Sequence, residues 1–471
     1  MEKVVIVGAG PVGCLAAYYA ARRGCQVDVY ELRSDLRSRQ SAPPASTQSI
    51  NLTLSERGIN AIKLAGHATL LSEIMDDTVP IIGRMVHGRN SDGSLYEHAQ
   101  KYDVKGRATH AVDRFSLNSH LLDAINSMPN VKLFFNHRLT SSNLHTHYAY
   151  FEVRDATSKL GHCHQAIEVT FDLLIGADGS HSVVRQHLMK VCPIDYHQEY
   201  LDMVWFAFHL TPHLVDRQDG RWAQYRISQN HLHIWPSKDL MFIAIANKDG
   251  SFTCTLFLSR QQSADLESNP SDLPAFFDKH FPGVTDLISG EKIISSFIKN
   301  SRLPIFSQKC RPAIYGQGVN AGMEDVRILY SILDKHAHTG HDAFTETQPE
   351  PPRSRFMLPF QRARALAEYS AMREADAHAI HSLALENYAE LRSSLSKRYR
   401  VRKFVEECIT DYFPSSGWRT KFAGVCFSND GHSAVLDQNQ RQGRLLITGF
   451  LVFFTYFFAV AAGVIGYCNW L

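Results

Sequence analysis

The first 31 residues alternate between short apolar runs and one stretch with helical spacing. VVIVG (4–8) and VDVYE (27–31) have the length and apolar character of buried strands, and CLAAYYAARRG (14–24) between them has apolar residues at helical steps. A strand, a helix and a second strand in this order predict a βαβ unit, which opens an α/β fold.

Two further patterns follow along the chain. Between residues 200 and 260, short apolar runs alternate and are bounded by turn residues, which predicts the strands of a β-sheet domain. The clearest of these runs are MVWFAFHL (203–210), HLHIWP (231–236), LMFIAIA (240–246) and SFTCTLFL (251–258). Residues 360–412 repeat apolar positions at steps of three and four, so we expect mostly helices there.

The last apolar run, LLITGFLVFFTYFFAVAAGVIGY (445–467), holds 23 residues without a charge. At 1.5 Å per residue, a helix of this length spans the roughly 30 Å hydrocarbon core of a bilayer. A buried core helix is the alternative, although such helices seldom run so long without a polar face. Arg441 and Arg444 precede the run, which favours a cytosolic N-terminal part, so we predict a C-terminal transmembrane anchor.

Two polar segments stand before the anchor. Residues 428–444 are polar, and we interpret them as a tether between the last helix and the membrane. RSSLSKRYRVRK (392–403) is strongly basic, which is typical of a solvated helix face, with a contact to anionic lipid head groups as the alternative.

Composition and charge narrow the function classes. The 471 residues are 44% hydrophobic, so the chain has enough apolar material for several folded domains and is not of the disordered class. Its 49 basic and 47 acidic side chains give a net charge of +2, without the basic field of a nucleic-acid-binding protein. Nine cysteines are scattered without a C-x-x-C pair, which favours a reducing compartment. The 24 histidines form no ligand cluster, and we predict no metal site.

The first turn of the chain carries the strongest chemical signal. Gly8, Gly10 and Gly13 form G-x-G-x-x-G directly after a strand and at the start of a helix, and Glu31 ends the next strand. In such a loop the first glycine allows a tight turn, the second lets a diphosphate approach the backbone, and the third lets helix and strand pack closely. The helix N-terminus favours the phosphates, and the acid can bind ribose hydroxyls. The sequence therefore predicts a dinucleotide site, without separating NAD from FAD.

Two later motifs add to this signal. Asp178-Gly179 follows a strand and precedes Arg185, although an ordinary Asp-Gly turn is the alternative. YGQGVNAG (315–322) stands at a helix start and offers backbone N–H groups suited to a flavin edge, with a plain glycine-rich helix entry as the alternative. Its candidate cofactor residues are Gly316, Gly318 and Asn320.

The order of these three motifs resembles the aromatic hydroxylases of the p-hydroxybenzoate hydroxylase type. Six segments narrow the resemblance to the kynurenine 3-monooxygenase family, in particular its fungal branch. They are SINLTLSERG (49–58), GRMVHG (83–88), HLHIWP (231–236), DGSFTCTLF (249–257), GQGVNAGMED (316–325) and LALENYAELR (383–392). The resemblance covers nearly the whole chain, including the apolar C-terminal run.

This resemblance implies a Rossmann-type FAD-binding domain, a β-sheet substrate domain, a helical C-terminal region and a C-terminal transmembrane helix. It implies FAD as cofactor, NADPH and O2 as co-substrates, and 3-hydroxylation of L-kynurenine, a step of tryptophan degradation and de novo NAD synthesis. No side chain is then catalytic, because the flavin supplies the oxygen chemistry. The implied location is the mitochondrial outer membrane, with the catalytic part facing the cytosol.

The resemblance and the patterns together divide the chain. The predicted parts are residues 1–195, an FAD-binding domain with substrate-contact insertions; 196–300, a β-sheet substrate domain; 301–335, a truncated return to the FAD-binding domain; 336–355, a linker; 356–427, a helical C-terminal region; 428–444, the tether; and 445–467, the anchor.

Family positions carry over one at a time. Arg84 matches the arginine that pairs with the substrate carboxylate, and Tyr96 matches its tyrosine partner. Asn387 matches an asparagine that reaches the substrate, and Tyr315 matches the aromatic residue facing the substrate ring. Arg114 matches the arginine that touches the flavin, and Asp178 lies at the family's Asp-Gly position. Outside these motifs, the same residues would be read as surface ion-pair partners or packing residues.

The chain departs from the family at two places. The family's second FAD motif, G-D-A-x-H-x-x-x-P after a strand, is absent, and no Gly-Asp dipeptide occurs in the sequence. A strand and loop are missing between Cys310 and Tyr315, which predicts an exposed sheet edge. One alternative is therefore an inactive variant of the enzyme that binds FAD weakly. A second alternative is a related hydroxylase with another substrate. The family tyrosine of the C-terminal region falls on Phe422.

Overall fold

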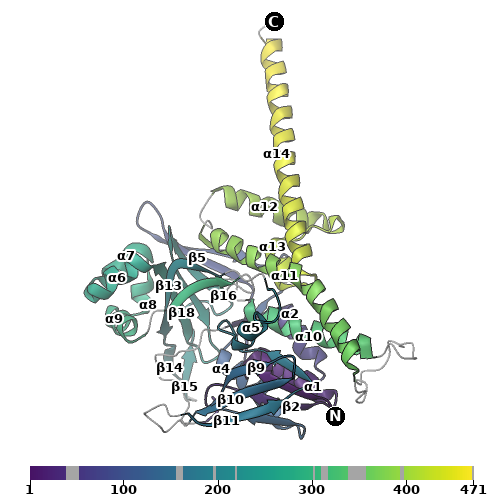
Figure 1. The fold of residues 1–471 in the computed structure, drawn as a ribbon. Helices are drawn as coiled ribbons and strands as arrows, with labels where there is room; N and C mark the ends of the chain where they lie inside the picture. Colours follow the sequence, from purple (N-terminus) through teal and green to yellow (C-terminus); the bar gives the residue numbers. More distant parts are fainter. Residues whose placement is uncertain are drawn as a thin grey trace.

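The computed structural model describes residues 1–38, 52–154, 163–194, 198–217, 220–300, 303–308, 317–337, 357–392 and 397–468. Within these residues the body is built on two large sheets, and helices from the C-terminal part of the chain lie across it (Figure 1). One long helix, the last, rises away from the body.

The first sheet is parallel and carries the N-terminal βαβ unit. Its strands are β1 (Lys3–Val7), β2 (Gln26–Tyr30), β8 (Val131–Phe134) and β12 (Leu173–Gly176), in the order β12-β1-β2-β8. Apolar side chains on one face of β1 pack against helices, and those on its other face pack against a smaller sheet. The strand is therefore buried on both faces, which is why VVIV reads as a continuous apolar run.

Helices and small sheets cover this first sheet. The helices of its core are α1 (Pro11–Arg22), α2 (Glu56–Leu64), α3 (Leu70–Asp76), α4 (Arg114–Asn126) and α10 (Gly318–Ala337). The sheet on the other face has the order β11-β10-β9, from Cys163–Thr170, Tyr148–Arg154 and His137–Asn143, and α5 (Val183–Leu188) contacts it. A three-stranded sheet of β3 (Leu52–Leu54), β7 (Thr109–Val112) and β4 (Val79–Ile81) adjoins them.

The second large sheet has seven strands and contains the four runs expected between residues 200 and 260. In order it comprises β19 (Leu303–Gln308), β13 (Gln198–Leu210), β18 (Phe252–Ser259), β17 (Leu240–Ala246), β16 (His231–Ser237), β5 (Gly83–Arg89) and β6 (Leu95–Lys101). Phenylalanines of β13, β17 and β18 pack against α6 (Arg260–Ser268), α7 (Leu273–His280), α8 (Val284–Leu287) and α9 (Gly290–Lys299). A hairpin of β14 (His213–Arg217) and β15 (Gly220–Gln224) adjoins it.

β12 is the exposed edge of the parallel sheet. It pairs with β1 on one side, and no strand among the described residues pairs with its other side. Its residues are half-buried or exposed, whereas β1 is almost wholly buried. This is the exposed edge that the missing strand predicts.

The segment just before the missing strand lies elsewhere than we predict. We expect residues 301–335 to return to the FAD-binding domain, but β19 pairs with β13 in the seven-stranded sheet. The chain joins the first domain only with α10, which packs against α1 and α2. The difference arises because Leu303–Gln308 finds its ladder hydrogen bonds at the free edge of β13, a pairing that an apolar run alone does not reveal.

Four helices form the C-terminal region: α11 (Pro359–Arg392), α12 (Lys397–Tyr412), α13 (Lys421–Cys426) and α14 (His432–Cys468). α11 packs against α10 and reaches β16, so it bridges the two sheets (Figure 1). The tether predicted at 428–444 differs from the structure, because its residues from His432 onward are the first turns of α14. Val435 and Gln442 are buried there, and α14 packs on α11 and α13.

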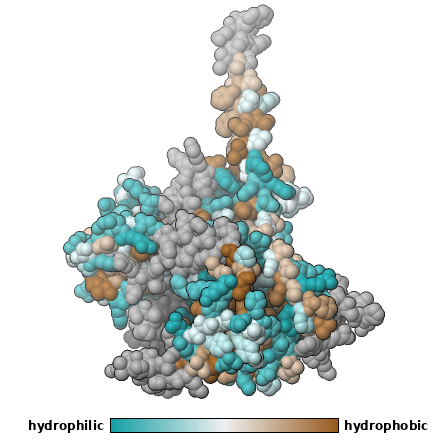
Figure 2. Space-filling view, in the orientation of Figure 1, coloured by the Kyte–Doolittle hydropathy of each residue, from teal (hydrophilic) through white to brown (hydrophobic). Residues whose placement is uncertain are grey.

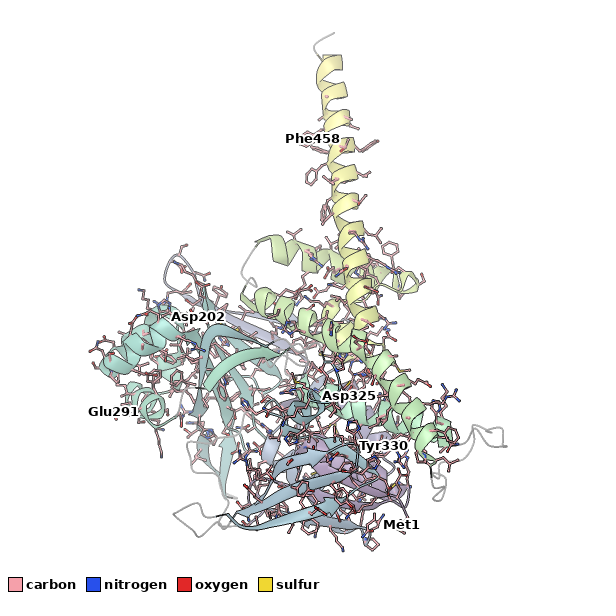
Figure 3. All side chains as sticks on the ribbon, in the orientation of Figure 1. Met1, Asp202, Glu291, Asp325, Tyr330 and Phe458 are labelled. Carbon is pink, nitrogen blue, oxygen red and sulfur yellow. The ribbon has the colours of Figure 1, made fainter. Side chains whose placement is uncertain are left out.

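Beyond these first turns α14 is exposed and apolar. Figure 2 shows hydrophobic side chains along the part that leaves the body, and in Figure 3 Phe458 projects from it into open space. His432–Ala462 is long and apolar enough to cross a bilayer, and its most apolar window has no residue buried against the rest of the protein. A helix of this kind lacks the protein contacts that would explain its apolar surface. The linker predicted at 336–355 lies outside the described residues, except that its first two residues end α10.

Candidate active site

The glycine loop has the geometry that a dinucleotide needs. Gly8 has a φ of +103°, and an added Cβ would overlap the carbonyl oxygen of Ala177. An added Cβ at Gly13 would overlap the carbonyl oxygen of Gly8, so both positions accept only glycine. Gly10 caps α1 without a side chain, and an added Cβ there would meet nothing within 4 Å. The space over Gly10 and the N-terminus of α1 therefore fits a diphosphate.

Glu31 holds this loop from the end of β2. One carboxylate oxygen accepts the N–H of Ala9 at 2.9 Å, and the other accepts the N–H of Arg33 at 3.0 Å. Each oxygen keeps a second lone pair for a ribose hydroxyl. Arg114, the first residue of α4, lies near them: desolvation of its guanidinium, followed by the charge of Arg33, lowers its pKa, while Glu31 raises it. The residues present here fit FAD.

Asp178 shapes the turn that leads into α5. One of its carboxylate oxygens accepts the N–H groups of Val183 at 2.7 Å and Val184 at 3.2 Å, and Gly179 has a φ of +80°. The other oxygen is buried without a hydrogen-bond partner among the described residues. Asp178 therefore orders the loop at the C-terminal end of β12, with one acceptor still available for a ligand hydroxyl.

Asn320 binds the protein itself. Its side chain is fully buried; the oxygen accepts the N–H of Ser55 at 2.9 Å, and the nitrogen donates to the carbonyl of Thr53 at 2.7 Å. These bonds tie the start of α10 to β3, so the side chain that we expect at a flavin edge is already engaged. Gly318, the first residue of α10, would place an added Cβ in open space. Tyr315 and Gly316 lie outside the described residues.

Arg84 and Asn387 are 303 residues apart in sequence and meet in the structure. An Arg84 guanidinium nitrogen donates to Asn387 Oδ1 at 3.0 Å, and both residues are buried. The guanidinium lies 5.5 Å from the ring centre of Tyr102 and 5.6 Å from that of Phe422. These two rings stack with centroids 3.9 Å apart. The guanidinium therefore lies beside the stacked pair of rings, and its burial there strengthens its attraction for a carboxylate.

Tyr96 lies further along the same strand pair. It is opposite Gly88 in the register of β5 and β6, whereas Gln100 is opposite Arg84. Its ring covers Gly88, where an added Cβ would overlap the hydroxyl oxygen. Tyr96 and Arg84 thus share one face of the sheet, four residues apart along it, or about 13 Å between backbones.

Sequence reasoning missed Tyr102 and Lys403. Lys403, on α12, lies with its ammonium 3.5 Å from Gln100 Oε1 and 3.4 Å from the carbonyl of Lys101. Its pKa is lowered from 10.5 to about 8, mainly by burial and next by the charge of Arg84. A second cation therefore faces the Arg84 site. The basic cluster at 392–403 did not predict this contact, because the sequence alone does not distinguish a lysine that faces the protein from one that faces solvent.

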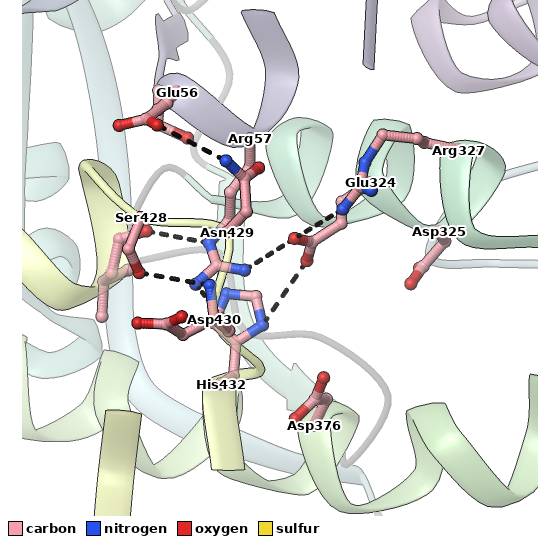
Figure 4. Close-up of polar contacts among 12 residues, drawn as sticks. Glu56, Arg57, Glu324, Asp325, Arg327, Asp376, Ser428, Asn429, Asp430 and His432 are labelled. Carbon is pink, nitrogen blue, oxygen red and sulfur yellow. Dashed lines mark hydrogen bonds and ion pairs between the residues drawn. The ribbon is translucent and has the colours of Figure 1, made fainter. Parts of the chain in front are cut away.

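A buried ionic cluster lies behind the glycine-rich helix start (Figure 4). Arg57 of α2 is 0% exposed and pairs at 2.7 Å with Glu324 of α10, which is 1% exposed. Arg373 of α11 reaches Glu324 at 3.2 Å, and a terminal nitrogen of Arg57 donates to the carbonyl of Asp430 at 2.5 Å. Burial, followed by the charges of Arg57 and Arg373, lowers the pKa of His432 well below its usual value. The cluster joins α2, α10 and α11 to the start of α14.

A cavity of about 380 Å³ lies beside the first turn of α4, with Asp113 and Ser116 in its lining. Asp77 lines it and accepts hydrogen bonds from Ser116 at 2.6 Å and His120 at 2.9 Å, with Lys248 3.3 Å away. These hydrogen bonds lower the pKa of Asp77 to about 2. None of the residues predicted to bind substrate or cofactor lines this cavity. Its polar groups bond to one another across the contact between the two sheets.

Three comparisons place the chain among known proteins. A family model described as "FAD binding domain" matches residues 1–272. The chain is 49% identical over 470 residues to a protein named kynurenine 3-monooxygenase from Chaetomium globosum, covering 95% of this chain and 96% of that one. It is 48% identical over 473 residues to a protein of the same name from Neurospora crassa, covering 95% and 89%.

Solved structures share its fold at lower identity. P. aeruginosa PqsL in complex with 2-aminobenzoylacetate superposes with a TM-score of 0.56 at 18% identity, over 83% of this chain and 96% of that one. Klebsiella pneumoniae HpxO complexed with FAD and uric acid gives a TM-score of 0.55 at 16% identity, over 90% and 96%. The fold is thus that of FAD-dependent monooxygenases. With identities near one half along almost its full length, the chain belongs to the kynurenine 3-monooxygenase family of FAD-binding proteins.

Proposed function

We propose that this chain hydroxylates L-kynurenine at position 3, with FAD as cofactor and NADPH and O2 as co-substrates, while α14 anchors it in the mitochondrial outer membrane facing the cytosol. The observation that carries the proposal is the buried Arg84 beside two stacked aromatic rings, on a chain nearly half identical to proteins named kynurenine 3-monooxygenase. A planar guanidinium suits a carboxylate because it can donate two parallel hydrogen bonds.

The sheet beside Arg84 supplies a place for an aromatic ring. Leu232 is in register with Arg84, and Ile234 with Val86, so these side chains share one face. Ile234 and Met241 are the buried centre of a small apolar cluster on that face. Two strand spacings, about 10 Å, separate β5 from β17. A substrate with a carboxylate at one end and an aryl ring at the other matches this arrangement.

In this proposal the chain's own residues bind and orient the substrate and the cofactor. Arg84 donates to the carboxylate, and Asn387 fixes the guanidinium through its amide oxygen. Tyr102 and Phe422 exclude water from the charge. Gly10 and the N-terminus of α1 would hold the FAD diphosphate, and Glu31 a ribose hydroxyl. FAD, when bound, supplies the oxygen chemistry.

The test uses the full chain, purified in detergent. We expect bound flavin in its absorbance spectrum and NADPH oxidation stimulated by L-kynurenine, with no stimulation by salicylate. Arg84→Met is expected to keep FAD and lose the kynurenine response, because it removes the charge and not the apolar contacts. Arg260→Met, which changes an exposed arginine of α6 outside both the Arg84 site and the cofactor motifs, is the matched control. Stimulation that survives Arg84→Met would refute the substrate assignment.

The missing Gly-Asp loop is tested with the same protein. A second version carries a strand and a Gly-Asp loop inserted between Cys310 and Tyr315, where the family pattern has them. Because the insertion would cover the free edge of β12, we expect it to raise thermal stability and FAD affinity together. Equal FAD affinity of the two versions would show that the chain holds FAD without that loop, and absent FAD in both would refute the cofactor.

A further inference from the structure

Several apolar side chains of α12 lie on its outer surface. Val401 is 54% exposed, Phe404 66% and Tyr412 75%, and Phe413 just after the helix is 63% exposed. Positions 401, 404 and 412 are separated by three and eight residues, so they fall on one face of a helix. Cys408, half-buried, lies on the same face between them.

Two polar side chains of α12, Lys403 and Glu407, face the protein. Lys403 lies over Gln100 and Lys101 of β6, and Glu407, one turn further, is 3.7 Å from Lys403. Arg402 pairs with Glu406 at 2.8 Å on the side of the helix that faces α14. An amphipathic helix on a water-soluble body buries its apolar face, whereas α12 presents that face outward. Its outer surroundings are therefore expected to be apolar.

The position of α12 on α14 shows where those surroundings are. An Arg402 guanidinium nitrogen lies 3.9 Å from the position of a Cβ added at Gly443, two residues before Leu445, where the exposed apolar part of α14 begins. Figure 1 shows α12 lying across α14 at the level where α14 leaves the body. If α14 spans a bilayer, α12 lies at the boundary between head groups and acyl chains.

We propose that the outer face of α12, formed by Val401, Phe404, Tyr412 and Phe413, inserts into the bilayer interface. The partner is the lipid surface, because α12 lies beside α14 where the exposed apolar part of α14 begins. The proposal rests on the membrane anchoring of α14. Its consequence is functional, because the same helix carries Lys403 on its inner face beside the Arg84 site. The membrane thereby holds one wall of the substrate site in place.

The test places a photo-crosslinking amino acid, p-benzoylphenylalanine, at one position at a time. The positions are Phe404 on α12, Phe453 on α14, and Ile298 on α9, which is equally exposed at 66% and belongs to the body. Each full-length variant is reconstituted into nanodiscs of phosphatidylcholine and phosphatidylserine, irradiated, and analysed by mass spectrometry for lipid adducts. All three positions are exposed, so the substitutions leave the core unchanged.

We expect lipid adducts at positions 404 and 453 and none at 298. Adducts at 453 without any at 404 would overturn the docking of α12 and leave the anchor standing. Absence of adducts at 453 would overturn the anchor and, with it, the docking. Crosslinking of position 404 to a second protein chain, or adducts at 298 equal to those at 404, would also overturn the proposal.

Discussion

Lys403 predicts a pH dependence of substrate binding that Arg84 alone would not give. Burial and the charge of Arg84 lower its pKa from 10.5 to about 8, whereas Glu407 and Glu390 raise it. This lowering of the pKa means that the protein disfavours the charged form of Lys403 by roughly 3 kcal/mol, at about 1.4 kcal/mol per pKa unit. A carboxylate bound between Arg84 and Lys403 would offset most of this cost, so substrate and proton bind together.

The sign of the effect follows from this linkage. Substrate raises the pKa of Lys403, so affinity is highest while Lys403 is protonated and falls as the pH rises through about 8. We expect the KM for L-kynurenine to rise about tenfold between pH 7.5 and 9. Lys403→Arg, which stays charged, is expected to remove this rise, and Lys403→Met to give a high KM at every pH.

The assay is NADPH oxidation in the full-length enzyme across that pH range. Lys101→Met is the control, because Lys101 is an exposed lysine on the neighbouring strand, and its variant is expected to keep the wild-type profile. The ionisation of the substrate's own amino group is common to all variants and cancels in the comparison. A Lys403→Arg enzyme with the wild-type rise in KM, or a Lys403→Met enzyme with an unchanged KM, would refute the reasoning.

The remaining predictions concern the buried cluster, the glycine loop and the aromatic wall of the site. Arg57→Met removes one of the positive charges that neutralise the buried Glu324. The free energy of unfolding, measured by urea denaturation, is expected to fall by about 3 kcal/mol. Gly13→Ala is expected to lower the thermal midpoint, whereas Gly10→Ala keeps the midpoint and weakens FAD binding, measured by flavin fluorescence quenching. Phe422→Tyr adds a hydroxyl near the carboxylate site and is expected to lower the KM for L-kynurenine by roughly tenfold, for about 1.5 kcal/mol; an unchanged KM would contradict this.

Features that depend on local sequence were predictable. The glycine loop is an example, because Gly8, Gly10 and Gly13 act on backbone atoms within one turn and on the adjoining strand end. The exposed edge of β12 also followed from sequence, since it required only the family's strand order and the absence of one strand. The family resemblance assigned Arg84 and Asn387 to the same substrate but did not predict the hydrogen bond between them, because no spacing rule links positions so far apart.

Features that depend on packing between distant segments were not predictable. Tyr102 lies close to Arg84 because it follows the end of β6, where it stacks on Phe422 of α13. Lys403 reaches Gln100 because α12 lies over β6, the edge strand of the seven-stranded sheet. Asn320 shows contacts that its motif did not reveal. Its motif indicates a ligand contact, but tertiary contacts with β3 engage both ends of its amide. A motif thus locates a residue near a site without fixing which way its side chain is directed.

In the proposed function, the C-terminal region contributes both to the substrate site and to the membrane anchor. Asn387, Lys403 and Phe422 come from α11, α12 and α13, and all three lie beyond the segment that matches the FAD-binding family model. Arg57 of α2 bonds to Asp430, just before α14, and to Glu324 of α10, which ties the start of α14 to the FAD-binding domain. α14 also packs on α11 and α13, so the helices that carry Asn387 and Phe422 hold the first turns of the last helix as well. Removal of the whole region after α10 would leave the glycine loop intact and would remove Asn387, Lys403 and Phe422 from the Arg84 site.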